Sequence, residues 1–312
     1  MIEKWHAICL ILQNIFYELA PSYGGHLGTA ADRTVRGNAE RAGPPRPITV
    51  YHDKELIEDL SAKLARWREC GATGFTLKTG SYGMADLALA IKVATVLKMD
   101  LLTIDGSGGG TGMSPPEMMD VWGVPSILLH AKAYEYASLL ASHGQKVVDI
   151  ALGGGLAKTS QIFKALALGS PFVKTVCMSR AFMIPAFLGC NIEGALHPER
   201  RKEVNGSWDA LPKFIADLGV TPESIFAGYH ALELRLGKET MKELPYGAIA
   251  TWTMCDRLGA GLQHLMGAAR RFTIADITRD DIASANRETE RETGIPFITD
   301  RQDETARRIL LS

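Results

Sequence analysis

One stretch decides the fold: Leu101-Leu102-Thr103-Ile104-Asp105-Gly106-Ser107-Gly108-Gly109-Gly110-Thr111-Gly112. Its first five residues are mostly apolar, which is typical of a buried parallel strand with both faces covered. A glycine-rich loop follows at once, and its backbone amides can approach a ligand closely because few side chains stand in the way. Asp105 ends the strand, where α/β barrels keep their chemistry. The alternative is an ordinary βα loop with one capping Asp.

Strand and helix patterns alternate around this stretch. Strands are predicted at 75–79, 101–105, 146–152 and 172–176, and helices at 54–69, 84–98, 127–142, 159–168 and up to about 189. This alternation predicts parallel strands joined by right-handed crossovers, and therefore an α/β fold. After residue 206 the pattern becomes helical, with candidates at 211–218, 223–236, 249–268 and 278–293.

The composition excludes several classes of protein. A chain of 312 residues can bury a core of barrel size. The net charge of -1 gives no electrostatic reason to expect nucleic acid or a membrane surface as a partner. The five cysteines are never spaced as CxxC, which favours reduced thiols in a cytoplasmic protein. The histidines form no HExxH motif, so we expect no metal.

Two strand ends carry the strongest site signal. Gly153-Gly154-Gly155 follow one predicted strand, and Ser179-Arg180 follow the next. In (βα)8 barrels the loops after strands 7 and 8 often bind phosphate through backbone amides and a helix N-terminus. Arg180 can add a charge-assisted contact. The alternative is a tight turn and a surface Arg.

Lys78 lies within an otherwise uncharged predicted strand. Because burying an ammonium group without a partner is costly, we expect Lys78 to face the barrel mouth, toward an anionic ligand or an electron-rich ring. The alternative is an edge strand with Lys78 in solvent. The glycine spacings match neither GxGxxG nor GxxxxGK(S/T), and no serine lies in a GxSxG elbow. Rossmann, P-loop and hydrolase interpretations therefore lack support.

Taken together, Lys78, the string Asp105–Pro115, the Gly153–Gly155 turn and Ser179-Arg180 resemble the synthase domain of glutamate synthase. They are most similar to the stand-alone FMN-binding glutamate-synthase-like proteins. The resemblance implies a (βα)8 TIM barrel that holds FMN. It also implies an oxidoreductase acting on CH-NH2 donors. In that reaction a 2-oxo acid, 2-oxoglutarate, forms an imine with ammonia, and hydride from reduced FMN converts the imine to glutamate.

The resemblance also divides the chain and assigns roles. The barrel would occupy residues 1–205, incomplete at its N-terminus, with a C-terminal helical extension over 206–312. Lys78 and Asp105 would be catalytic. The cofactor-binding residues would be Gly106, Gly108, Gly109, Thr111 and Gly112 beside the flavin, and Gly154, Gly155, Ser179 and Arg180 at its phosphate. Gly25 and His26 fall in the substrate-side loop of the family.

Three departures from the family pattern matter. Cys190 matches the first of three cysteines that bind a 3Fe-4S cluster, but Leu196 and Arg201 occupy the next two positions, so we expect no cluster. The chain begins without the N-terminal Cys of a glutaminase, so ammonia would come from solution or from a partner. Residues 1–23 cannot contain the strands that precede Gly24 in the family.

The short N-terminal part leads us to expect a partner subunit or a homo-oligomer, because an open half-barrel would expose its strand edges. Two other functions stay open. The chain can be a non-catalytic or degenerate paralogue that needs a partner chain, or another barrel enzyme that binds FMN or phosphate.

Overall fold

The computed structural model describes residues 53–80, 83–107, 121 and 123–312. Contacts within it define two compact units. The first takes in the described residues up to Gly155, Lys164–Cys177 and Thr273–Ser312, and the second takes in Leu156–Phe163 and Met178–Phe272. These units differ from the single division after residue 205 that the sequence suggested, and that division stays a prediction about domains.

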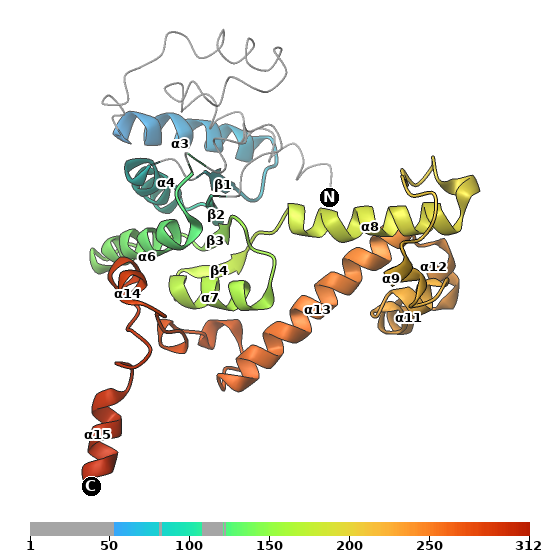
Figure 1. Ribbon diagram of the computed structural model, residues 1–312. Helices are drawn as coiled ribbons and strands as arrows, with labels where there is room; N and C mark the ends of the chain where they lie inside the picture. Colours follow the sequence, from blue (N-terminus) through green and yellow to red (C-terminus); the bar gives the residue numbers. More distant parts are fainter. Residues whose placement is uncertain (1–52, 81–82, 108–120, 122) are drawn as a thin grey trace. The chain divides into compact units, whose positions relative to one another are not determined.

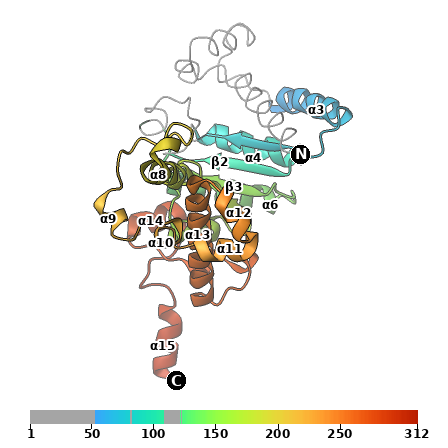
Figure 2. The same ribbon diagram turned by 90° about the vertical axis from the view of Figure 1, so that its right-hand side faces the viewer.

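A parallel four-stranded sheet forms the centre of the first unit (Figures 1 and 2). Its strands are β1 (Thr76–Thr79), β2 (Leu101–Asp105), β3 (Ile150–Gly153) and β4 (Val173–Val176), which neighbour one another in chain order. The connections contain α4 (Met84–Val96), α6 (Ser126–Ser142) and α7 (Thr159–Gly169). Crossovers between parallel neighbours are right-handed in nearly all proteins, which places the connecting helices of such a sheet on one face. This order is compatible with part of a barrel.

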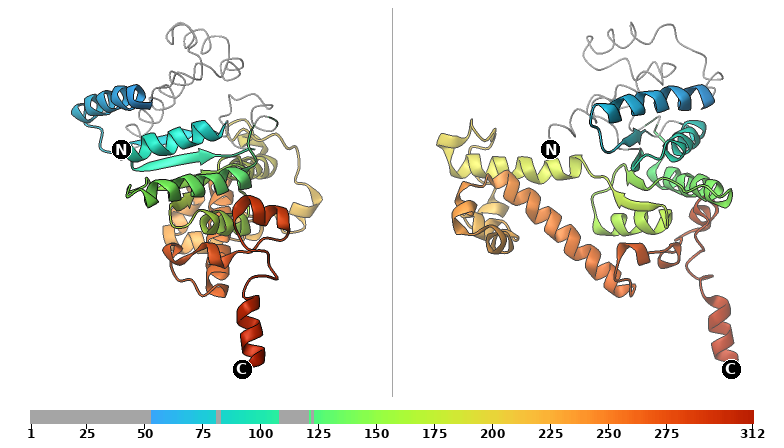
Figure 3. Two further views of the ribbon diagram at one scale, coloured as in Figure 1. Left: turned by 90° about the vertical axis from the view of Figure 1, so that its left-hand side faces the viewer. Right: turned by 180° about the vertical axis from the view of Figure 1, so that it is seen from behind.

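Helices cover one face of the sheet. α4 and α6 pack side by side along it (Figures 1 and 3). α3 (Asp53–Glu69) precedes β1 and packs on α4 through Leu60 and Val93, which are 2% and 3% exposed.

The two faces of the sheet differ because side chains alternate along each strand. One face carries apolar, buried side chains, which are Leu77, Leu102, Ile104, Ile150 and Leu152. The other face carries a row of aligned residues. The register pairs Lys78 with Thr103, Thr103 with Ala151, and Ala151 with Thr175. Lys78 therefore shares this second face with small and polar residues.

The segment 278–293 does not form the single solvated helix that its charges suggested. A short 3-10 turn, η5 (Arg279–Asp281), is followed by extended chain, and a parallel bridge joins Ser284 to Phe297. Only α14 (Arg287–Thr293) is helical, and it packs on α6. The first unit also contains η4 (Ile274–Asp276) and α15 (Asp303–Leu311).

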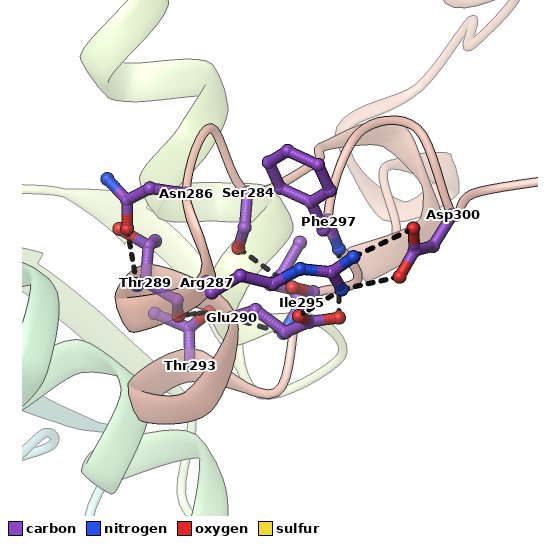
Figure 4. Close-up of polar contacts among 9 residues, drawn as sticks. All are labelled: Ser284, Asn286, Arg287, Thr289, Glu290, Thr293, Ile295, Phe297 and Asp300. Atoms are coloured by element: carbon purple, nitrogen blue, oxygen red, sulfur yellow. Dashed lines mark hydrogen bonds and ion pairs between the residues drawn. The ribbon is translucent and has the colours of Figure 1, made fainter.

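Polar contacts hold the loop around α14 in place (Figure 4). The Asn286 side chain accepts a hydrogen bond from the Thr289 amide at 2.8 Å, which caps the helix N-terminus. The Arg287 guanidinium lies over the Phe297 ring, 4.5 Å from its centroid, and also contacts Asp300. The polar and charged side chains of this segment, which suggested a solvated helix, therefore hold a loop in place.

Two long helices, α8 (Arg180–Leu196) and α13 (Tyr246–Ala268), organise the second unit. They pack at backbone distance, because a Cβ added at Gly189 would lie 2.4 Å from the Tyr246 carbonyl oxygen. The shorter helices are η3 (Pro198–Arg200), α9 (Lys213–Ala216), α10 (Pro222–Ile225), α11 (Tyr229–Leu236) and α12 (Lys238–Glu243). One hydrophobic core joins the long and the short helices of this unit. It consists of Ile192, Ile215, Phe226, Tyr229, Leu232, Met241, Ile249 and Ala250.

A buried carboxylate also joins α8 to the start of α13. Glu193 is 1% exposed, and its Oε2 accepts a hydrogen bond from the Tyr246 amide at 2.8 Å. Its Oε1 lies 2.7 Å from Arg200 Nη1. The negative charge is favourable there because the first amides of a helix carry partial positive charge.

All four predicted strands are confirmed, and β2 has the predicted bounds. β3 begins at Ile150 rather than at residue 146, since the Val148 amide donates to Thr95 Oγ1 at 3.3 Å instead of to a strand. The predicted helix 223–236 is wrong as one element, because the chain breaks between α10 and α11.

Two further helices differ in length from their predictions. The helix expected at 211–218 shrinks to α9, and α8 continues to Leu196 instead of ending near 189. None of the described helices combines the length and the apolar composition that crossing a bilayer requires.

Candidate functional site

Lys78 and Asp105 lie together at the carboxyl ends of β1 and β2. Lys78 Nζ is 2.9 Å from Asp105 Oδ2, and the two side chains are 50% and 11% exposed. The largely buried carboxylate needs a partner, and Lys78 supplies it. An ammonium group has three N–H donors. Because Asp105 does not use all of them, Lys78 can also bind a ligand.

Glycines are required where β2 and β3 end. The Gly106 amide donates to the Gly153 carbonyl at 3.0 Å. Gly154 has a φ of 103°, and a Cβ there would lie 2.7 Å from backbone atoms of Gly106. Gly155 has a φ of 68°, also in the left-handed region that side chains disfavour. These residues let the two strand ends approach each other at backbone distance.

Two side chains of α6 contact this glycine turn. Ser126 Oγ donates toward the carbonyls of Gly154 at 2.9 Å and Ser107 at 3.1 Å. His130 Nε2 lies 3.1 Å from the Gly153 carbonyl oxygen. The sequence did not single out either residue. The available signal was their i, i+4 spacing, which on α6 places a hydroxyl and an imidazole on one helical face.

His130 is neutral at physiological pH. Its side chain is 3% exposed, and burial lowers its pKa to about 4, although the Gly153 carbonyl and the Asp105 charge act in the opposite direction. A carbonyl oxygen only accepts hydrogen bonds. The single ring proton must therefore lie on Nε2 and be donated to Gly153.

This end of the sheet can hold an anion. Lys78 provides a positive charge, and glycine turns with positive φ present backbone amides to anions. A Cβ added at Gly155 would meet only the Ser107 carbonyl oxygen, at 3.8 Å, so no other described residue lies within 4 Å of that position. The groups present are therefore suited to a phosphate or a carboxylate.

Ser179 and Arg180 lie at the start of α8, in the second unit, and Arg180 is the first helical residue. Ser179 is the residue before the helix, and its carbonyl accepts a hydrogen bond from the Phe182 amide at 2.9 Å. The role of these two residues as phosphate ligands stays a prediction. Six other expected site residues lie outside the described residues: Gly25, His26, Gly108, Gly109, Thr111 and Gly112.

The side chains at the expected cluster positions have packing roles. Cys190 Sγ would lie 3.2 Å from a Cβ at Gly247, and Arg201 Nε donates to the Gly194 carbonyl at 3.2 Å. Across the described ranges, no group of His, Cys, Asp and Glu has an arrangement that could hold a metal ion.

Comparison with known proteins identifies a family to which this sequence is similar. Residues 28–199, more than half of this 312-residue chain, match the family model described as the conserved region in glutamate synthase.

Two relatives carry related names. An archaeal glutamate synthase (NADPH) from Methanocaldococcus jannaschii is 28% identical over 188 residues, which is 56% of this chain and 33% of the relative. An archaeal-type glutamate synthase (NADPH) from Dehalococcoides mccartyi is 26% identical over 176 residues, which is 55% of this chain and 34% of the relative. The chain therefore spans about a third of the length of these curated relatives.

Proposed function

Because the chain belongs to the glutamate synthase family, we propose that it is an FMN-dependent oxidoreductase that reductively aminates a 2-oxo acid. The proposed reaction converts 2-oxoglutarate and ammonia to glutamate. The described sheet would be part of a (βα)8 barrel, with Lys78 on its inner face. The names of both relatives support the oxidoreductase class. The observation that carries the proposal is the Lys78–Asp105 pair beside the glycine turn of β3.

The residues of the chain divide into those that hold the cofactor and those that act on the substrate. Gly154 and Gly155 would hold the FMN phosphate, and the loop that begins at Gly106 would border the ring. When bound, FMN would supply the hydride that reduces the imine. The protein contributes binding and orientation, which is its usual share in cofactor chemistry.

Lys78 would act on the substrate. Its ammonium can attract a carboxylate of the 2-oxo acid, and Lys78 Nζ can donate a proton to the imine nitrogen, which makes the imine carbon electron-poor. Asp105 holds this amine in place through the 2.9 Å contact. The pair therefore combines substrate attraction with proton donation.

The test combines a spectrum with a turnover. We expect the purified protein to be yellow, or to become yellow on reconstitution with FMN. After anaerobic reduction, 2-oxoglutarate with ammonium chloride should reoxidise the flavin and yield glutamate, and neither compound alone should do so. Protein that cannot be loaded with FMN would contradict the proposal. A loaded protein whose flavin stays reduced would indicate a different barrel enzyme.

The coverage of the relatives favours a second candidate, a subunit that acts with another chain. The chain matches 33% and 34% of the two relatives, so a complete activity of their kind can require segments that this chain does not match. We expect such a subunit to bind FMN only in complex. Sedimentation velocity of the protein with and without FMN, and after co-expression with its neighbouring genes, separates the two candidates.

A further inference from the structure

We propose that Ser126 and His130 of α6 are positioning residues that turn the amides of Gly154 and Gly155 toward an anionic ligand. The proposal rests on the proposed function only for the identity of that ligand, the FMN phosphate. In this proposal neither side chain touches the ligand. Each acts by holding a carbonyl group of the turn.

The first step concerns the peptide between Gly153 and Gly154. The peptide bonds of this turn are trans, so the C=O and the N–H of each unit point in opposite directions. The Gly153 carbonyl accepts the Gly106 amide at 3.0 Å and His130 Nε2–H at 3.1 Å. Because this oxygen is held toward β2, the Gly154 N–H must point away from β2.

The next peptide repeats the arrangement. The Gly154 carbonyl accepts the Ser126 hydroxyl at 2.9 Å, so the Gly155 N–H points away from Ser126. Within the described part of the chain, the backbone hydrogen bonds of the turn do not use the amides of Gly154 or Gly155 as donors. Two successive amides are therefore directed away from α6, where they can bind an anion.

This arrangement needs fixing because glycine peptides rotate easily. Glycine adopts positive and negative φ about equally well, so both peptide units can flip and withdraw their amides. The α6 side chains oppose this flip before the ligand arrives, which reduces the ordering that binding would require. The start of α6 is itself seated closely, because a Cβ at Gly106 would lie 2.5 Å from Ser126 Oγ.

Three variants test the proposal in the full chain. Ser126→Ala removes one donor, and His130→Leu replaces the other with an apolar side chain of similar size. His130→Gln keeps a donor near the position of Nε2. Ser142→Ala and His143→Leu serve as matched controls at the far end of α6, where both side chains contact the Leu139 carbonyl at 2.8 Å.

The measurements are dissociation constants for two probes, FMN and inorganic phosphate. Ser126→Ala and His130→Leu should each weaken binding at least about tenfold, the effect of one misdirected hydrogen-bond donor. His130→Gln should stay within about threefold of the wild type, and both controls should bind as the wild type does. Circular dichroism verifies that each variant is folded.

A second measurement needs no ligand. Nitrogen-15 NMR of the His130 ring at pH 7 should show the proton on Nε2, and a proton on Nδ1 would overturn the proposal. Unchanged binding of both probes by Ser126→Ala and His130→Leu would overturn it too. So would a His130→Gln variant as weak as His130→Leu, because the residue would then only fill space.

The outcomes also separate this inference from the proposed function. Wild-type protein that binds phosphate but not FMN, with the expected losses in the variants, would contradict the FMN proposal and support the positioning role. Protein that binds FMN equally well in all variants would do the opposite. Wild-type protein that binds neither probe would contradict both.

Discussion

Asp105 connects the separate parts of the candidate site. Its Oδ2 pairs with Lys78 at 2.9 Å, and its Oδ1 would lie 2.9 Å from a Cβ at Gly153. Its charge also acts on the buried His130. One carboxylate therefore links β1, the glycine turn of β3 and a side chain of α6, so a change at Asp105 will affect all three.

The Lys78 amine should be required for activity. We expect Lys78→Met to lower turnover of 2-oxoglutarate by about a hundredfold or more, because both substrate attraction and proton donation are lost. The matched control is Lys132→Met, which removes an exposed Lys132–Glu135 ion pair with a 2.7 Å contact. Steady-state rates of FMN-loaded protein measure the effect. Equal activity in both variants would remove Lys78 from the mechanism.

The buried His130 should make stability depend on pH. Its pKa is about 4 in the folded protein and 6.5 in the reference state, so the unfolded chain binds more protons between these values. Stability therefore falls as the pH drops from 6.5 through 4, and the loss between pH 7 and pH 5 is about 2 kcal/mol. Urea unfolding at both pH values measures it. The His130→Gln variant should lose less by about that amount, and an equal loss in both proteins would place the histidine in solvent.

Sequence reasoning singled out some residues of the candidate site and not others, for a physical reason. Lys78 and Asp105 stand out because charged side chains at the end of apolar strands need partners or ligands. Ser126 and His130 act on backbone carbonyls of the turn, and a sequence does not show where those carbonyls point.

At the scale of elements, the contact between α8 and α13 depends on a missing side chain. A Cβ at Gly189 would lie 2.4 Å from the Tyr246 carbonyl and 2.5 Å from the Gly247 amide nitrogen. We expect Gly189→Ala to destabilise the protein by about 1–3 kcal/mol, because backbone must move to admit the methyl group.

The control for this prediction is Gly259→Ala, inside α13. A Cβ at Gly259 has no neighbour within 4 Å among the described residues, so alanine should stabilise the helix by up to about 1 kcal/mol. Thermal unfolding of both variants measures the difference. A neutral Gly189→Ala variant would show that the two helices are less closely packed than described.

The strands were predictable because their signals are local. β2 has the bounds predicted from its apolar run, which ends at Asp105-Gly106. The segment 278–293 was not predictable in this way. Its charges fit a helix, but Arg279 Nη1 donates to the Leu168 carbonyl at 2.6 Å, across 111 residues of sequence. A contact between residues so far apart in sequence can favour a non-helical backbone, and it leaves no pattern in the local sequence that could be recognised.

At the scale of the whole molecule, the division into compact units follows contacts that are distant along the chain. Residues 273–312 belong to the unit that contains the sheet, although 178–272 lie between them and β4 in sequence. Local sequence patterns alone suggested that all helices after residue 206 belong to one C-terminal extension. The repeated βα pattern was enough to predict parallel strands, but it does not state which later helices return to them.

Ligand binding should stabilise the molecule in a way that identifies the anchoring group. At a hundred times its dissociation constant, FMN should raise the free energy of unfolding by about 2.7 kcal/mol, because it binds only the folded state. Riboflavin has the same ring but no phosphate, so it would lack the contact that we propose for the amides of Gly154 and Gly155. At equal concentration it should give a much smaller rise of the unfolding temperature in scanning calorimetry. Equal shifts with both compounds would mean that the ring, and not the phosphate, provides the affinity, and the glycine turn of β3 would lose its proposed role.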